Sequence, residues 1–198
     1  MSSDPTILIL MYFVLPLWLA AGFADWLCHR ATHIETTTGA KESLIHLLMF
    51  TEMGAPLLAA IFLEINALII AFMIVMFLAH EATAFWDVRY AVTAREVAPN
   101  EQHVHSFLEI IPLMAIVCVV SLHWGQFLAL FGAGEETARF TLTWQPDKLP
   151  IAYVVTLLAV ILLFELLPFI EELLRGLSAN AGRLIPPAAR RAASGRAD

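Results

Sequence analysis

Long apolar stretches alternate along the chain with short stretches in which charged residues gather. Five apolar stretches are long enough to cross a hydrocarbon core about 30 Å thick, which takes roughly 20 helical residues. They lie at residues 6–24, 43–63, 66–87, 105–131 and 151–173. The second and third form one run that is too long for a single crossing, so we expect a tight hairpin at Glu64-Ile65-Asn66. The pattern predicts an all-α, polytopic membrane bundle of five transmembrane helices.

The composition agrees with this pattern. Of the 198 residues, 60% are hydrophobic and 15% are charged, whereas a soluble domain is about 45–50% apolar and about 25% charged. An ordinary soluble enzyme is therefore excluded. The net charge of −7 argues against a nucleic-acid partner, because binding phosphates requires a basic face.

Lysine and arginine predict the orientation of the bundle. Alternate loops and tails carry nine and two basic residues, and the richer side normally faces the cytoplasm. We therefore expect the N-terminus outside and the C-terminus in the cytoplasm, in an integral protein of a bacterial inner membrane. Residues 1–178 form the transmembrane domain in this interpretation. Residues 179–198 form a flexible basic tail against anionic lipid headgroups.

Histidines and carboxylates fall together at the predicted cytoplasmic ends of four helices. Six of the seven histidines lie on that side, and most are spaced from an acid so that both share one helical face. The sets are Asp25, His29 and His33; Glu42 and His46; His80 and Asp87; and Glu101, His105 and Glu109, with His103 beside the last. Imidazole and carboxylate together suit iron, manganese or zinc. The number of candidates favours two metal ions, and Glu165 is at a depth that would close the site.

Simpler interpretations exist for these residues. A single membrane histidine usually bonds to a neighbouring helix, and ionisable groups gather near interfaces because the membrane centre is costly for them. Those effects explain the depth of the residues but not their one-sidedness or spacing. Elsewhere, we expect Glu52 to be a protonated or hydrogen-bonded packing residue. Glu172 and Arg175, three apart, are expected to form an ordinary surface pair, and FTLTWQ weakly suggests a short strand or an interfacial segment.

Two motifs resemble those of the membrane-bound histidine-box enzymes, the group of fatty acid hydroxylases, desaturases and carotenoid oxygenases. HRATH, with His29 and His33, has the HxxxH form of a first box, and HVH, with His103 and His105, resembles a later one. The chain has no HxxHH string. The resemblance implies a di-metal centre at the cytoplasmic ends of the helices that oxidises lipid-like substrates with dioxygen.

These observations favour a di-iron or di-manganese oxidoreductase that hydroxylates or desaturates an apolar, lipid-like substrate entering from the membrane. Arg89 and Arg95 would then hold an anionic headgroup or a cytosolic electron donor. One alternative is a membrane zinc hydrolase of lipid amides or esters. Others are a b-type haem protein with His46 and His80 as axial ligands, and a non-catalytic membrane subunit. The sequence leaves open the metal, the substrate, the electron donor and the catalytic residues.

Overall fold

The computed structural model describes residues 4–187, which form helices and contain no strand. The elements in chain order are α1 (Pro5–Ile9), η1 (Leu10–Val14), α2 (Leu15–Ala31), α3 (Ala40–Phe62), α4 (Ala67–Ala91), α5 (Pro99–Leu122), α6 (Trp124–Ala129), α7 (Ile151–Ile161), η2 (Leu162–Leu166) and α8 (Leu167–Ala179). The all-α prediction is confirmed for this part of the chain.

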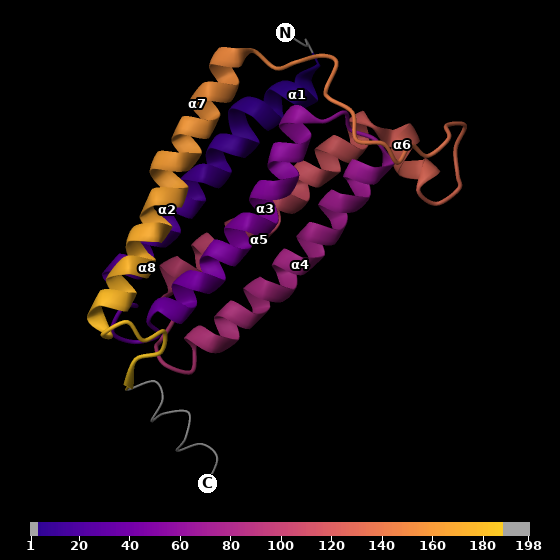
Figure 1. Ribbon diagram of the computed structural model, residues 1–198. Helices are drawn as coiled ribbons and strands as arrows, with labels where there is room; N and C mark the ends of the chain where they lie inside the picture. Colours follow the sequence, from indigo (N-terminus) through magenta and orange to yellow (C-terminus); the bar gives the residue numbers. More distant parts are fainter. Residues whose placement is uncertain (1–3, 188–198) are drawn as a thin grey trace.

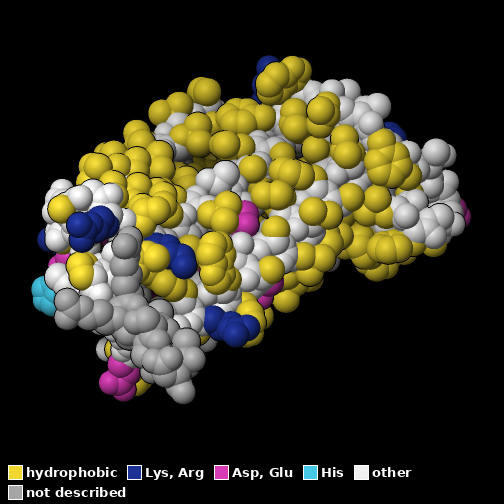
Figure 2. All heavy atoms as spheres, turned by 60° about the horizontal axis from the view of Figure 1, so that its bottom comes forward, with side chains coloured by type: hydrophobic (Ala, Val, Ile, Leu, Met, Phe, Trp, Pro, Cys, Tyr) yellow, Lys and Arg dark blue, Asp and Glu magenta, His cyan; other side chains and the backbone are white. Residues whose placement is uncertain are grey.

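Five continuous helices within residues 4–187 are long and apolar enough to cross a membrane. The first is α1, η1 and α2 run together, and the last is α7, η2 and α8. The helices form an elongated bundle with the two chain ends at opposite ends (Figure 1). Hydrophobic side chains cover much of the long face in Figure 2, and several Lys and Arg side chains gather at the end that comes forward. A membrane bundle of five spans is the architecture these features support.

Two of the five long helices contain one wide π-helical turn, and each such turn ends shortly before a proline. The η1 turn precedes Pro16, and the η2 turn precedes Pro168. Proline lacks the backbone N–H of a regular helix, and its ring clashes with the carbonyl four residues earlier. A π-turn relieves that clash within a continuous helix, and it changes the direction in which the following side chains point.

The predicted hairpin between the second and third spans is confirmed. Helix α3 ends at Phe62, α4 begins at Ala67, and Asn66 caps α4 by accepting a hydrogen bond of 3.3 Å from the Ile69 N–H. Beyond the membrane helices, the segment expected to be a strand or an interfacial segment forms one isolated bridge, between Leu63 and Trp144.

The predicted bounds of the fourth span, residues 105–131, are wrong at both ends. Helix α5 begins six residues earlier, because Pro99 stands at its first turn and Ala98 is extended. It ends at Leu122, since His123 leaves the helical conformation with φ −121° and ψ 39°, and α6 follows as a separate short helix. The earlier start makes the Glu101–His105 region helical throughout.

Packing divides the bundle into an apolar half and a polar half. Helix α3 packs against α4 and α8, and α2 packs against α5. One buried apolar cluster is centred on Ile70 and Met73 of α4, and a second joins Ile61 of α3 to Val154 and Leu157 of α7. The buried ionisable residues of the other half lie toward the α2–α3 and α4–α5 connections. This polar half positions the candidate site.

The chain after α8 folds back on the start of α3. The Lys41 N–H donates a hydrogen bond of 3.0 Å to the Leu184 carbonyl, and Pro186 is buried. Gly39 at this contact has φ 75° and no space for a side chain against Pro186, a conformation that favours glycine. Residues 188–198 of the predicted tail lie outside the described residues.

Candidate metal site

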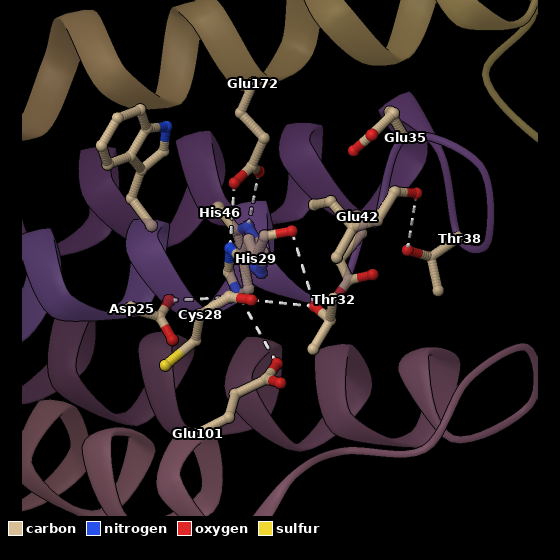
Figure 3. Close-up of polar contacts among 12 residues, drawn as sticks. Asp25, Cys28, His29, Thr32, Glu35, Thr38, Glu42, His46, Glu101 and Glu172 are labelled. Carbon is tan, nitrogen blue, oxygen red and sulfur yellow. Dashed lines mark hydrogen bonds and ion pairs between the residues drawn. The ribbon is translucent and has the colours of Figure 1, made fainter.

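Eight ionisable side chains from five helices meet in the polar half of the bundle, and we call them the histidine–carboxylate cluster. Figure 3 shows its members from α2 and α3 together with Glu101 and Glu172. The eight side chains are Asp25 and His29 of α2, Glu42 and His46 of α3, Asp87 of α4, Glu101 and His105 of α5, and Glu172 of α8. All are buried except His105, which is partly exposed. Burying so many ionisable groups is costly unless they are paired or bind metal ions.

Glu172 holds the two central histidines in one orientation. The His29 and His46 rings are stacked, with centroids 4.4 Å apart and planes 10° from parallel. One Glu172 oxygen lies 2.9 Å from Nδ1 of His29, and the other lies 3.1 Å from Nδ1 of His46. A carboxylate only accepts hydrogen bonds, so each Nδ1 carries a hydrogen and each Nε2 of the neutral rings is left with its lone pair. This is how carboxylates orient the histidine ligands of metal ions.

The two Nε2 atoms face carboxylate oxygens. Nε2 of His29 lies 3.5 Å from an Asp25 oxygen and 3.6 Å from a Glu101 oxygen, and Nε2 of His46 lies 3.3 Å from an Asp87 oxygen. Nε2 of His29 is buried without a hydrogen-bond partner, and so is Oδ1 of Asp87. The second oxygen of Asp25, Oδ1, lies 2.9 Å from Nε2 of His105. Lone pairs that face one another in this way require a cation between them, either a proton or a metal ion.

Two groups of three residues can each place their ligand atoms within 4.8 Å of one another. The first is Asp25, His29 and His105, and the second is His29, Glu42 and His46. Two ligand atoms that each lie about 2.0–2.2 Å from one metal ion are also within 4.8 Å of each other. Because both groups contain His29, the positions they define are neighbours. The cluster therefore has the donor atoms for one ion or for two adjacent ions.

Arg95, in the connection between α4 and α5, joins two of the carboxylates. Its Nη2 lies 2.5 Å from an oxygen of Glu42 and 2.5 Å from an oxygen of Glu101. Burial lowers the pKa of Arg95, but the hydrogen bonds and charges of Glu101 and Glu42 outweigh burial and raise the pKa above its ordinary value. Arg95 is thus a fixed buried cation, and the expectation that it holds a headgroup or an electron donor is wrong. Arg89 is exposed, with its guanidinium 5.5 Å from the Phe85 ring centroid.

A cavity of about 460 Å³ adjoins the cluster. Asp25, His46, Asp87 and His105 line its polar end. The rest of its wall is mostly apolar, and it reaches Leu19, Leu57 and Leu158, which pack on the second apolar cluster. His80 and Glu109 also line the cavity, His80 buried and Glu109 exposed. The volume is in the ~300–1,000 Å³ range of small-molecule sites, so an apolar molecule can lie against the cluster.

Four of the predicted site residues lie outside the cluster: His80 and Glu109 line the cavity, whereas His33 and His103 reach neither the cluster nor the cavity. His33 follows the end of α2 with φ 51°, so the helical face shared by Asp25 and His29 does not extend to it. Its side chain is 74% exposed and lies 3.2 Å from Glu35. His103 is exposed against Phe107, because two residues on a helix turn about 200° and point it away from the face of His105.

The expectation of a surface pair between Glu172 and Arg175 is wrong. Glu172 is 1% exposed and bonds to the two histidines, whereas Arg175 pairs with Glu171 and Glu35. The sequence contains a signal for this arrangement. Glu165 and Glu172 are seven residues apart, which places them on one helical face, and both are buried.

We found no similar protein by sequence or by structure. The chain matches no protein-family model, no curated protein and no solved structure. The chemistry of the site is therefore argued from its own residues.

Proposed function

We propose that the chain is a membrane oxidoreductase whose histidine–carboxylate cluster binds two iron ions and oxidises an apolar molecule held in the adjoining cavity. The observation that carries the proposal is the buried set of Nε2 and carboxylate lone pairs that face one another at the polar end of that cavity. Such a set is stable with metal ions bound between its members, and the cavity leaves the ions accessible to a substrate.

The charges of the cluster support two ions. Five buried carboxylates and one guanidinium leave four negative charges when the histidines are neutral. Two divalent cations would neutralise them. The mixed imidazole and carboxylate donors suit iron or manganese, and helical bundles that hold two such ions use the same donor types. A structural zinc site usually takes four ligands, fewer than the cluster offers.

The chemistry proposed is hydroxylation or desaturation by dioxygen. In hydroxylation, a substrate C–H, dioxygen, two electrons and two protons give an alcohol and one water. In desaturation, the substrate loses two hydrogens, and dioxygen with two further electrons and two protons gives two waters. The histidine–carboxylate cluster would hold the ions, whose chemistry would be the activation of dioxygen, and the electrons would come from a reduced cytosolic iron–sulfur protein. The cavity keeps the apolar substrate out of water and beside the cluster.

The orientation proposed places the cluster at the cytoplasmic face of a bacterial inner membrane. Within residues 4–187, six of the eight basic residues lie at the cluster end of the bundle, and such ends normally stay in the cytoplasm. A cytosolic donor would then reach the cluster, while a lipid-like substrate enters from the membrane.

The test is metal analysis and oxygen consumption by detergent-purified protein. We expect about two iron ions per chain, bound iron lost in His29→Ala and His46→Ala, and retained in the matched control His33→Ala, whose side chain is exposed. Less than one transition-metal ion per chain, unchanged by alanine at His29 and His46, would contradict the proposal. Bound zinc with turnover independent of oxygen would also contradict it and favour the hydrolase.

A further inference from the structure

Glu165 is a buried carboxyl group that the metal chemistry does not use. It lies on the η2 turn, is 5% exposed and lines the cavity. Its Oε1 atom is buried without a hydrogen-bond partner. The groups that can hold a metal ion among residues 4–187 do not include it. A buried polar atom without a partner is costly, so its presence in the wall of a cavity requires an explanation.

Two local features direct this carboxyl group into the cavity. The π-turn before Pro168 contains Glu165 and sets its direction, and such turns are frequent at functional sites. On the facing helix, α2, the residue opposite is Gly22, where a Cβ atom would overlap the Glu165 carboxyl. The carboxyl therefore lies against the backbone of α2, three residues before Asp25.

The surroundings indicate what Glu165 binds. Small-molecule sites are mostly apolar, with a few polar groups that fix the orientation of the ligand. Trp18, Met53, Leu57 and Ile161 are among the apolar residues that line the same cavity. A ligand with a hydrogen-bond donor would give Oε1 its missing partner, and its chain would fill the apolar remainder.

We infer that Glu165 binds the hydroxyl or amino group of the substrate, which is a long-chain alcohol or amine. The inference rests on the proposed function, because it takes the cavity as the substrate site. Glu165 in this assignment selects and orients the substrate, while the cluster performs the oxidation.

The experiment measures binding without turnover, in metal-free protein held in lipid nanodiscs. The probe is a bromoalkane that binds in the cavity and quenches the fluorescence of Trp18. Its displacement by cetyl alcohol, hexadecylamine or hexadecane is measured as the recovery of that fluorescence. Trp18→Phe protein gives the background signal of the other tryptophans. We expect wild-type protein to prefer the alcohol or the amine over the alkane. Glu165→Leu should reduce that preference about tenfold, the equivalent of one hydrogen bond, and leave alkane binding unchanged.

Two further variants separate the sources of the effect. Glu165→Gln keeps a hydrogen-bonding side chain but cannot become an anion, so it should retain a preference for the alcohol and lose one for the amine. Glu52→Gln is the control, because Glu52 is also a buried carboxyl but bonds to Thr83 outside the cavity lining. It should bind like wild type.

Equal binding of the alcohol, amine and alkane by wild-type protein would overturn the inference. So would a Glu165→Leu variant that keeps the full preference, or one that loses alkane binding as well. The outcome is independent of metal content. A preference that depends on Glu165 in a protein that binds no iron would overturn the proposed oxidation alone, and iron binding without the preference would overturn the role of Glu165 alone.

Discussion

Replacing Glu172 by Gln tests the assignment of the cluster with a change of very few atoms. The carboxylate accepts hydrogen bonds from Nδ1 of His29 and of His46, at 2.9 and 3.1 Å, in a position that is 1% exposed. A glutamine amide has only one acceptor oxygen. One of the two imidazole N–H groups therefore loses its acceptor and meets an N–H donor in its place.

The expected loss of stability follows from the number of imidazole N–H groups left without an acceptor. One buried donor without a partner costs about 1–3 kcal/mol of unfolding free energy, and Glu172→Ala, which leaves two donors unpaired, should cost about twice as much. Loss of a partner that orients a metal-binding histidine typically lowers metal affinity 10–100-fold. We expect both effects in Glu172→Gln.

The assays are reversible unfolding of the metal-free protein in mixed micelles and titration of iron against a chelator. Glu171→Gln is the matched control, because the neighbouring carboxylate is 42% exposed and its ion pairs are at the surface, where a pair contributes about 0–1 kcal/mol. If Glu172→Gln had the stability and iron affinity of Glu171→Gln, Glu172 would not orient the two histidines, and the reasoning would fail.

Three further predictions test other parts of the polar half and the hairpin. Gly176→Ala should cost about 1–3 kcal/mol by overpacking, measured by thermal melting, because its Cβ would lie 2.9 Å from the backbone nitrogen of Ala40. Arg95→Leu should cost about 3–5 kcal/mol in the same melts, since it leaves two fully buried carboxylates without their cation. Hydrogen bonds from Thr143 and Arg139 lower the pKa of Glu64. Wild type should therefore be more stable than Glu64→Gln above the ordinary pKa of 4.5, and the difference should vanish as pH falls through the lowered pKa.

Each of these three predictions has a control variant or an outcome that would contradict it. Gly54→Ala has open space at its Cβ and should be neutral or stabilising, so an equal loss at both glycines would contradict the packing argument. Arg89→Leu removes an exposed arginine and should change stability by less than about 0.5 kcal/mol. A difference between wild type and Glu64→Gln that persists at the lowest pH would show that charge is not its source.

Helical periodicity explains why most of the cluster could be predicted from the sequence. Asp25 and His29, or Glu42 and His46, are four residues apart within one helix, so the spacing alone places both on one face. Each predicted face that remained helical does reach the cluster or the cavity. His33 shows the limit of this reasoning, because a left-handed residue at the helix end redirects the chain, and no spacing rule contains that change.

Two other parts of the site, the contacts of Arg95 and the position of Glu172, depend on tertiary structure. Arg95 lies in a connection between helices, and only the tertiary fold brings Glu42 of α3 and Glu101 of α5 to its guanidinium. Glu172 has an arginine three residues away that suggested a surface pair, but packing of α8 on α3 turns it inward. In a membrane bundle, the side of a helix that faces protein is set by its neighbours, since lipid and protein interior are similarly apolar.

The order of Glu172, His29 and His46 along the chain also sets an order for biosynthesis. His29 and His46 leave the ribosome more than a hundred residues before the carboxylate that orients them. A nascent chain lacks the acceptor for both imidazoles until α8 has been made and has packed against α2 and α3. In the proposed function, metal loading at full affinity would therefore follow the synthesis of α8, and ribosome-stalled chains that end before Glu172 should bind iron as weakly as the Glu172→Ala protein.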